Sequence, residues 1–256
     1  MTGLRIGPIG PQSHLPRVLS LQDLFARLSR AEEREKEIYR TEDTFGSVVV
    51  REYDGLRPLC FDSLFEQSAM RVDNPLTLVH EYTRAMLLAL LFKEPEQVAL
   101  LGLGGGSLLR SLHSCCSQAD FQVVELRKSV IHIAIDHFFA PNDARVHFHN
   151  RNGIDYLNDA SVHSADMVFA DMYQAYSMEG FQSSERFLEQ CWKLLTADGW
   201  LIINFHELPY FGDPYLDRMC DLFPEVLCCG TSSGNYVIMC GKQKLAQSLP
   251  EFQYRL

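Results

Sequence analysis

A glycine-rich loop and an acidic residue farther along the chain have the types and spacing of a nucleoside-binding site. The loop follows the apolar run Val98–Leu101, and a second strand-like run ends at Glu125. Glycine adopts positive φ at little cost, and without a Cβ it lets a ligand approach the backbone. An acid about 20 residues beyond such a turn can accept both hydroxyls of a ribose. Loop and acid together favour a nucleoside site over a purely structural strand–helix turn. The loop glycines are Gly102, Gly104, Gly105 and Gly106.

Asp171 is the candidate for reaction chemistry. It directly follows the apolar run 167–170, at the carboxyl end of an expected central strand, where α/β sheets bind their ligands. A carboxylate there could act on a bound ligand, whereas a helix cap is the alternative role. Tyr173 could contact a substrate or cover the core, and His80 could face a pocket or belong to the core.

We predict no metal site and no disulfide framework. His147 and His149 alternate on an expected strand with a spacing that suits a metal, but no cysteine or acid stands nearby as a partner. The eight cysteines include two vicinal pairs and no C-x-x-C motif. Such a pattern favours reduced, mostly buried thiols over a zinc site.

From residue 98 onward, strand-like and helix-like segments alternate, as in a doubly wound α/β domain. The last two strands flank the turn-forming segment 230–234, which predicts an antiparallel edge. The expected helices are 107–114, 129–138, 153–157 and 184–195. The expected strands are 98–101, 121–126, 146–149, 167–170, 200–205, 225–229 and 236–240.

The part before residue 98 has a different organisation. Residues 1–37 read as an appendage whose stretch 18–37 has helical spacing of apolar residues. Its apolar face must pack on the body of the protein or on a second subunit, and we predict that it contributes to a homodimer. Residues 38–72 predict a small antiparallel sheet of two or three strands. A helix is expected from Pro75 to Phe92, capped by Asn74. The domains are therefore predicted as 1–37, 38–72 and 73–256.

Charge and hydropathy exclude several functional classes. The net charge of −10 disfavours nucleic acid as the main partner and is compatible with a cationic substrate. The longest apolar run, Ala85–Phe92, is too short to span a membrane. The first residues lack the apolar core of a signal peptide, so we expect a cytoplasmic protein without a membrane partner.

The spacing of the glycines decides between two nucleotide-binding folds. A dinucleotide fold expects G-x-G-x-x-G, but Ser107 stands at the third glycine position. The loop fits G-x-G-x-G, the style of S-adenosylmethionine folds. An expected helix end followed by a tight Asp198-Gly199 turn into the next strand is typical of methyltransferase domains. We therefore expect a Rossmann-like methyltransferase fold, with a mostly parallel seven-stranded sheet, preceded by the small β-sheet.

These motifs, in this order, resemble the spermidine synthase (polyamine aminopropyltransferase) family over residues 40–240. His80-Glu81 matches the Tyr-His-Glu motif of that family, and Glu125 matches its ribose-binding acid. Residues 151–153 fall on the segment over the adenine, and 171–174 fall on the catalytic Asp-Ser-x-Asp. The resemblance implies a catalytic Asp171, a cofactor site at the loop glycines, Glu125, Asn152 and Gly153, and an amine site at His80, Tyr173 and Gln174.

The departures from the family concern mainly the amine. Gly105 replaces the loop acid that holds the amino group of the decarboxylated cofactor, and Gln174 replaces the second catalytic acid. Val79 replaces the tyrosine before the histidine, and Gly46 replaces the glutamine of an early Tyr-Gln pair. Asn152 replaces an adenine-binding Asp, which is a mild change because its carbonyl still accepts a hydrogen bond.

The sequence thus predicts a transferase that binds S-adenosylmethionine, its decarboxylated form or methylthioadenosine, with a small-molecule substrate such as a cationic amine. Three functions remain open. They are aminopropyl transfer with relaxed amine recognition, methyl transfer on the same fold, and nucleoside binding without catalysis.

Overall fold

The computed structural model describes residues 35–62, 65–172, 180, 182–209 and 212–245. The amphipathic stretch 18–28, on which the predicted homodimer rests, lies outside these residues, as do Tyr173 and Gln174. Among the described residues, no helix is both long and apolar enough to cross a membrane.

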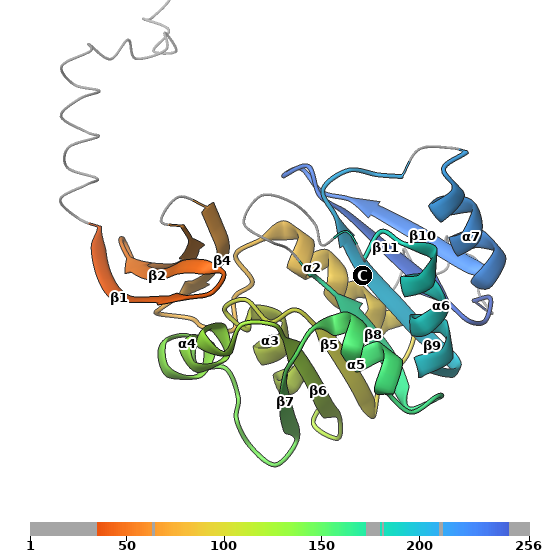
Figure 1. Ribbon diagram of the computed structural model, residues 1–256, viewed down its shortest axis with the longest axis horizontal. Helices are drawn as coiled ribbons and strands as arrows, with labels where there is room; N and C mark the ends of the chain where they lie inside the picture. Colours follow the sequence, from red (N-terminus) through yellow and green to blue (C-terminus); the bar gives the residue numbers. More distant parts are fainter. Residues whose placement is uncertain (1–34, 63–64, 173–179, 181, 210–211, 246–256) are drawn as a thin grey trace, which may run out of the picture. The chain divides into compact units, whose positions relative to one another are not determined.

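The N-terminal sheet has four strands in the order β1-β2-β3-β4 (Figure 1). The expectation of two or three strands and of a helix through residue 37 was therefore wrong, because β1 begins at Lys36. This strand has Ile38 and Tyr39 next to one another between charged residues and lies at the sheet edge, where charges are common and apolar periodicity is weak. The strands are β1 (Lys36–Asp43), β2 (Gly46–Glu52), β3 (Leu56–Phe61) and β4 (Phe65–Arg71).

One face of this sheet is buried against helix α4 (Lys128–Phe138). Val48, Val50 and Met70 form a cluster with Ile133 and Phe138 of that helix. A small sheet needs such a partner surface to be stable. The N-terminal sheet is thereby fixed close to the helix that follows Glu125.

The large sheet has seven strands in the order β10-β11-β9-β8-β5-β6-β7 (Figure 1). Neighbours from β9 to β7 run parallel, whereas β11 is antiparallel to both β9 and β10. The predicted mixed sheet with an antiparallel edge is confirmed. Its strands are β5 (Gln97–Leu101), β6 (Asp120–Glu125), β7 (Val146–Asn150), β8 (Ala165–Ala170), β9 (Leu195–Phe205), β10 (Glu225–Gly230) and β11 (Tyr236–Gly241).

Alternate residues of the central strands enter two separate cores, as the period of two requires. Leu100 and Phe169 pack with α2, α3 and α4 on one face. Leu101 and Val168 pack with α5, α6 and α7 on the other. The remaining helices are α2 (Glu81–Leu87), continued by a 3₁₀ turn (Leu88–Leu91), α3 (Ser107–Cys115), α5 (Gly153–Asp159), α6 (Glu185–Leu194) and α7 (Pro214–Leu222).

Two elements begin at other residues than predicted, and one helix was not predicted. Helix α2 begins at Glu81, six residues after Pro75, because the chain first makes a turn closed by a hydrogen bond from Thr77 N to the Asn74 carbonyl and then a bridge from Leu78 to Met70. Strand β9 begins directly after α6, so the Asp198-Gly199 turn lies within it, at a shift of register against β8. Helix α7 was not predicted.

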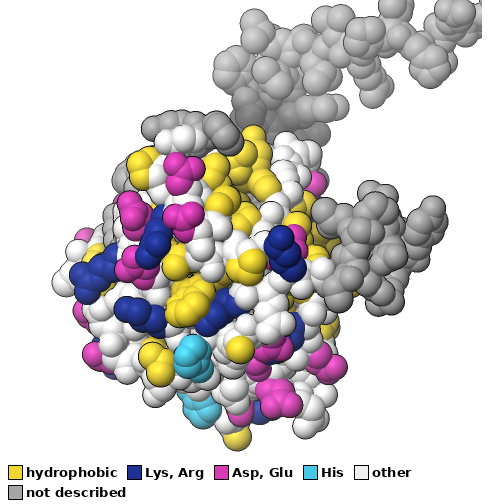
Figure 2. All heavy atoms as spheres, turned by 90° about the vertical axis from the view of Figure 1, so that its right-hand side faces the viewer, with side chains coloured by type: hydrophobic (Ala, Val, Ile, Leu, Met, Phe, Trp, Pro, Cys, Tyr) yellow, Lys and Arg dark blue, Asp and Glu magenta, His cyan; other side chains and the backbone are white. Residues whose placement is uncertain are grey.

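Figure 2 shows one face of the described part of the chain. On the face shown in Figure 2, acidic and basic side chains are interspersed with apolar ones. The glycine loop, Glu125 and Asp171 lie at the strand ends of the large sheet.

Candidate nucleoside and acceptor site

The glycine loop joins β5 to α3 in the conformation that its composition predicts. Gly102, Gly104 and Gly106 all have positive φ, of 96°, 53° and 68°. A Cβ at Gly102 would overlap the main-chain oxygen of Asp171. Only glycine therefore fits where the ends of β5 and β8 lie side by side, and the loop brings the predicted cofactor site next to the predicted catalytic residue.

Glu125, at the end of β6, is tied to this loop by main-chain amides. Its Oε2 accepts a hydrogen bond from Leu103 N at 3.1 Å, and its Oε1 accepts one from Arg127 N at 2.9 Å. Burial raises the pKa of Glu125, against these backbone hydrogen bonds, which lower it. The Gly104 amide also lowers this pKa by a hydrogen bond. A carboxylate has about four acceptor positions in all, so Glu125 retains capacity to accept from a ribose hydroxyl.

Asn152 and Gly153 lie at the start of α5, at the same edge of the sheet. The Asn152 Oδ1 caps this helix by accepting from Ile154 N at 2.8 Å. A Cβ at Gly153 would lie 2.7 Å from the Met172 sulfur. The segment therefore contacts the residue directly after Asp171.

Asp171 is held by side chains from two distant elements. Its Oδ2 accepts from the Tyr82 hydroxyl of α2 at 3.0 Å, and its Oδ1 accepts from Asn204 Nδ2 of β9 at 2.8 Å. Asn204 Oδ1 in turn accepts from Asn235 Nδ2 at 3.0 Å. Burial raises the pKa of Asp171, although both hydrogen bonds to the carboxylate oppose that shift. The result is an oriented carboxylate with raised proton affinity, which suits a base.

Gln182 fixes the chain just beyond Asp171. Its side chain is fully buried, accepts from Met172 N at 2.9 Å and donates to the Asn204 main-chain oxygen at 3.0 Å. The Tyr215 hydroxyl donates to the Gln182 carbonyl at 2.9 Å. Sequence analysis missed Tyr82, Asn204 and Gln182. Only the position of Asn204 near the end of an expected central strand could have indicated one of them.

His80 contacts Tyr82, the donor to Asp171. Its ring stacks on Tyr82 with centroids 5.7 Å apart, and its Nε2 is 3.5 Å from Glu66 Oε1 of β4 without forming a hydrogen bond. Burial lowers the pKa of His80 and raises that of Glu66, so the pair tends toward its neutral forms. His80 is thus placed to support Tyr82 and does not contact Asp171.

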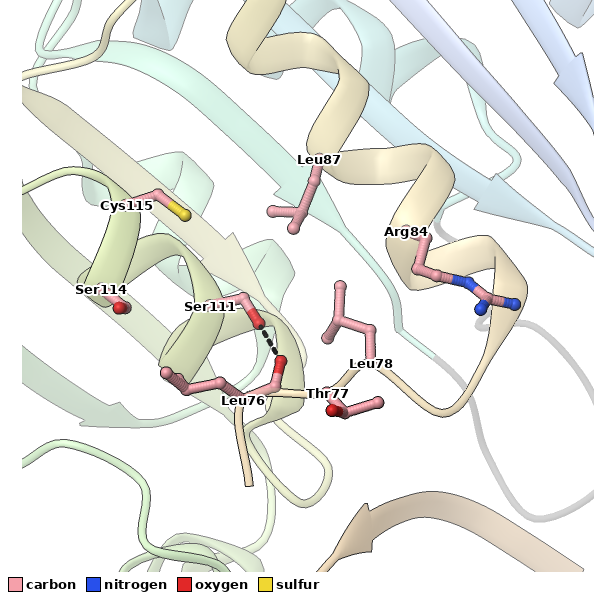
Figure 3. A pocket seen from close by; sticks show the side chains of 8 residues that line it. All are labelled: Leu76, Thr77, Leu78, Arg84, Leu87, Ser111, Ser114 and Cys115. Atoms are coloured by element: carbon pink, nitrogen blue, oxygen red, sulfur yellow. Dashed lines mark hydrogen bonds between the residues drawn. The ribbon is translucent and has the colours of Figure 1, made fainter. Parts of the chain in front are cut away.

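A hollow of about 300 Å³ lies elsewhere, between α2 and α3 (Figure 3). Leu78 and Leu87 point toward one another across it, and the Ser111 hydroxyl donates to the Leu76 carbonyl at its edge. None of its lining residues belongs to the glycine loop or is a predicted site residue. The candidate site is therefore defined by converging polar groups at the strand ends and not by this hollow.

Comparison with known proteins agrees with this architecture. The sequence model of the spermine/spermidine synthase domain matches residues 78–221. A polyamine aminopropyltransferase of Neisseria meningitidis serogroup A is 28% identical over 200 residues, which are 76% of each chain. That of Chromobacterium violaceum is 26% identical over 200 residues, 77% of this chain and 76% of the relative.

Solved structures show the same fold at lower identity. A probable spermidine synthase from Corynebacterium glutamicum has a TM-score of 0.71 at 16% identity, with 82% of each chain covered. A spermidine synthase in complex with the transition-state analogue AdoDATO has a TM-score of 0.65 at 19% identity, covering 81% of this chain and 74% of that one. Human methyltransferase-like protein 13 in complex with SAH has a TM-score of 0.61 at 21% identity, and the match covers 68% of this chain and 88% of that one.

Proposed function

The chain belongs to the spermine/spermidine synthase family, and from that premise we propose that it is a transferase acting on an adenosyl sulfonium. The cofactor is S-adenosylmethionine or its decarboxylated form, and the acceptor is a small amine. The observation that carries the proposal is the Glu125 carboxylate, bonded to Leu103 N and Arg127 N beside the glycine loop. That carboxylate, which retains acceptor capacity beside these amides, has the chemistry that a ribose diol requires.

In this proposal the described residues divide the cofactor between them. Glu125 binds the ribose, Asn152 and Gly153 lie along the adenine, and the loop glycines leave room for the sulfonium end. When bound, the cofactor supplies an electrophilic carbon next to a positively charged sulfur. The protein has to exclude water, orient the acceptor and accept its proton.

Asp171 performs the last two tasks. One of its carboxylate oxygens accepts the proton of the acceptor nitrogen. Burial raises the pKa of Asp171, and a base whose pKa is nearer to the working pH transfers protons more effectively. Tyr82 and Asn204 keep the carboxylate in one orientation. Because Gln174 stands where the family has a second acid, we propose that a diamine is a poor acceptor.

Methyl transfer is the second candidate. The neighbour of the same fold, human methyltransferase-like protein 13, is bound to SAH, the product that methyl transfer from S-adenosylmethionine leaves. Aminopropyl transfer would instead release methylthioadenosine, so the nucleoside product distinguishes the two reactions. Nucleoside binding without turnover would release neither.

Calorimetric titration of the full chain with methylthioadenosine, S-adenosylmethionine and its decarboxylated form tests the proposal. We expect saturable binding of methylthioadenosine and of at least one sulfonium. Absence of binding by all three would overturn the proposed function. The predicted homodimer is tested separately by light scattering at micromolar concentration, where a monomer would contradict it.

A further inference from the structure

The space beside Gly105 is filled by neutral groups. A Cβ at Gly105 would lie 2.9 Å from Phe138 Cδ1 and 2.9 Å from the Ser68 hydroxyl oxygen. Phe138 is fully buried and Ser68 is 7% exposed, so neither can easily move aside. A side chain at position 105, acidic or not, cannot be accommodated, and no acid of the loop can face the bound cofactor.

The charged group in contact with Gly105 is a cation. Arg110, in the first turn of α3, is only 5% exposed, and its Nη1 donates to the Gly105 carbonyl at 2.7 Å and to the Phe138 carbonyl at 2.6 Å. Its other hydrogen bonds reach the Pro75 carbonyl and the Ser107 hydroxyl. Within the described part of the chain, its hydrogen bonds thus go to neutral oxygens. A buried charge without a counter-charge is unfavourable.

The neighbouring acids do not neutralise this end of the loop. Glu125 accepts from Leu103 N at the beginning of the loop, and Asp171 lies against Gly102 and is bonded to Tyr82 and Asn204. Burial lowers the pKa of Arg110 to about 10, so the guanidinium is still charged at neutral pH. Helix α3, of nine residues, also begins here without a side-chain cap, and its first amides add partial positive charge.

The two possible cofactors differ by one group. S-Adenosylmethionine carries an α-carboxylate at the end of its tail, and the decarboxylated form has only the amine there. Resting on the proposed function, we infer that this site selects the carboxylate-bearing S-adenosylmethionine. The positive field of Arg110 and the α3 amides attracts the carboxylate, and the Ser68 hydroxyl can donate to it.

Substitution of Ser68 tests the inference, since its oxygen occupies the space where an acid at position 105 would begin. The full-length wild type, Ser68→Asp and Ser68→Asn are titrated calorimetrically with both sulfonium forms and with methylthioadenosine, which has no charged tail. We expect the wild type to bind S-adenosylmethionine about tenfold more tightly than the decarboxylated form. That ratio corresponds to the free energy of one charge-assisted hydrogen bond. Ser68→Asp reverses the preference, and the neutral, equally large Ser68→Asn does not.

Tighter binding of the decarboxylated form by the wild type would overturn the inference, as would an unchanged preference in Ser68→Asp. Methylthioadenosine distinguishes failure of this inference from failure of the proposed function. If the proposed function is wrong, the wild type does not bind methylthioadenosine; if only the inference is wrong, it still does. Thermal unfolding and methylthioadenosine affinity report whether Ser68→Asp folds. If it does not fold, Ser68→Ala serves instead, and we expect it to lose about tenfold in affinity for S-adenosylmethionine alone. An equal loss for all three ligands would contradict the inference.

Discussion

Two partly buried carboxylates flank the end of β5, and they are held in opposite ways. Glu125 accepts hydrogen bonds from main-chain amides 2 and 22 residues away in the sequence. Asp171 accepts from side chains 89 and 33 residues away. The nucleoside half of the site is thus built from backbone geometry, whereas the acceptor half depends on which side chains α2 and β9 supply.

This difference explains how one half can diverge while the other persists. Amides at Leu103 and Arg127 are present whatever side chains those positions carry, so the ribose acid keeps its orientation through much substitution. Tyr82, Asn204 and Gln182 each act through a specific functional group. A change at any of these positions alters the acceptor half directly.

The largest expected effect concerns diamine transfer, where a divergent acceptor half should fail. With decarboxylated S-adenosylmethionine and putrescine, we expect methylthioadenosine release several powers of ten slower than about 1 per second, because each lost anchor costs on the order of 1–3 kcal/mol in the transition state. Asp171→Asn provides the background rate. Turnover of about 1 per second or faster would contradict the proposal that the acceptor half has diverged while the nucleoside half has not.

The next effect separates the halves by binding alone. Glu125→Ala leaves two ribose hydroxyls without a charged acceptor and should cost about 1.5–3 kcal/mol in methylthioadenosine affinity, or roughly ten- to more than a hundredfold. Asp171→Asn, the matched change in the other half, should keep most of that affinity. Calorimetry measures both, and equal losses would show that the division is wrong.

The pH dependence of stability should differ in sign between Asp171 and Asp43. Burial raises the pKa of Asp171, so its ionised form opposes folding. Asp171→Asn should therefore be more stable than wild type above that pKa, with the gain disappearing as the pH falls toward the unfolded value of about 3.9. Chemical denaturation at several pH values measures this gain, and a less stable variant at neutral pH would contradict it.

Asp43 is the control in the N-terminal sheet. Burial tends to raise its pKa, but hydrogen bonds from Arg127 and Ser129 outweigh that and lower it. Asp43→Asn should lose about 1–2 kcal/mol at neutral pH, and the loss should fade as the pH falls from about 3.9 through the lowered pKa. A pH-independent loss would exclude the charge as its cause.

The smallest effect sharpens the role of Tyr82. Tyr82→Phe removes the donor to Asp171 Oδ2, so the pKa of Asp171 should rise further. Carboxyl ¹³C NMR over a pH series follows this titration, and methylthioadenosine affinity should stay unchanged. An unchanged or lower titration midpoint would show that Tyr82 does not stabilise the ionised carboxylate.

The sequence by itself predicted the large sheet and the glycine loop, because both have local signals. Buried parallel strands such as Val98–Leu101 are continuous apolar runs, and the glycines at 102, 104 and 106 occupy positions that require positive φ. The positions of Glu125 and Asp171 followed from the same rule, since polar residues directly after such strands face the ligand edge.

Tertiary contacts decided what local signals could not. Asn74 and Pro75 have the composition of a helix start, yet the Pro75 and Leu76 carbonyls accept from Arg110 and Ser111 of α3. These bonds hold the segment in a turn at residues 75–76 and a bridge at Leu78, so that the helix begins only at Glu81. Local propensity is worth only fractions of a kcal/mol per residue, and a few hydrogen bonds to a packed helix outweigh it.

The acceptor half of the site is also decided by tertiary contacts. Tyr82, Asn204 and Gln182 come from three separate segments and meet only when α2 and β9 pack beside β8. A tyrosine in a helix and an amide in a strand have no periodicity or spacing that marks them as partners. Their role arises because Asp171 is partly buried and its carboxylate takes its donors from the side chains that the fold brings to it.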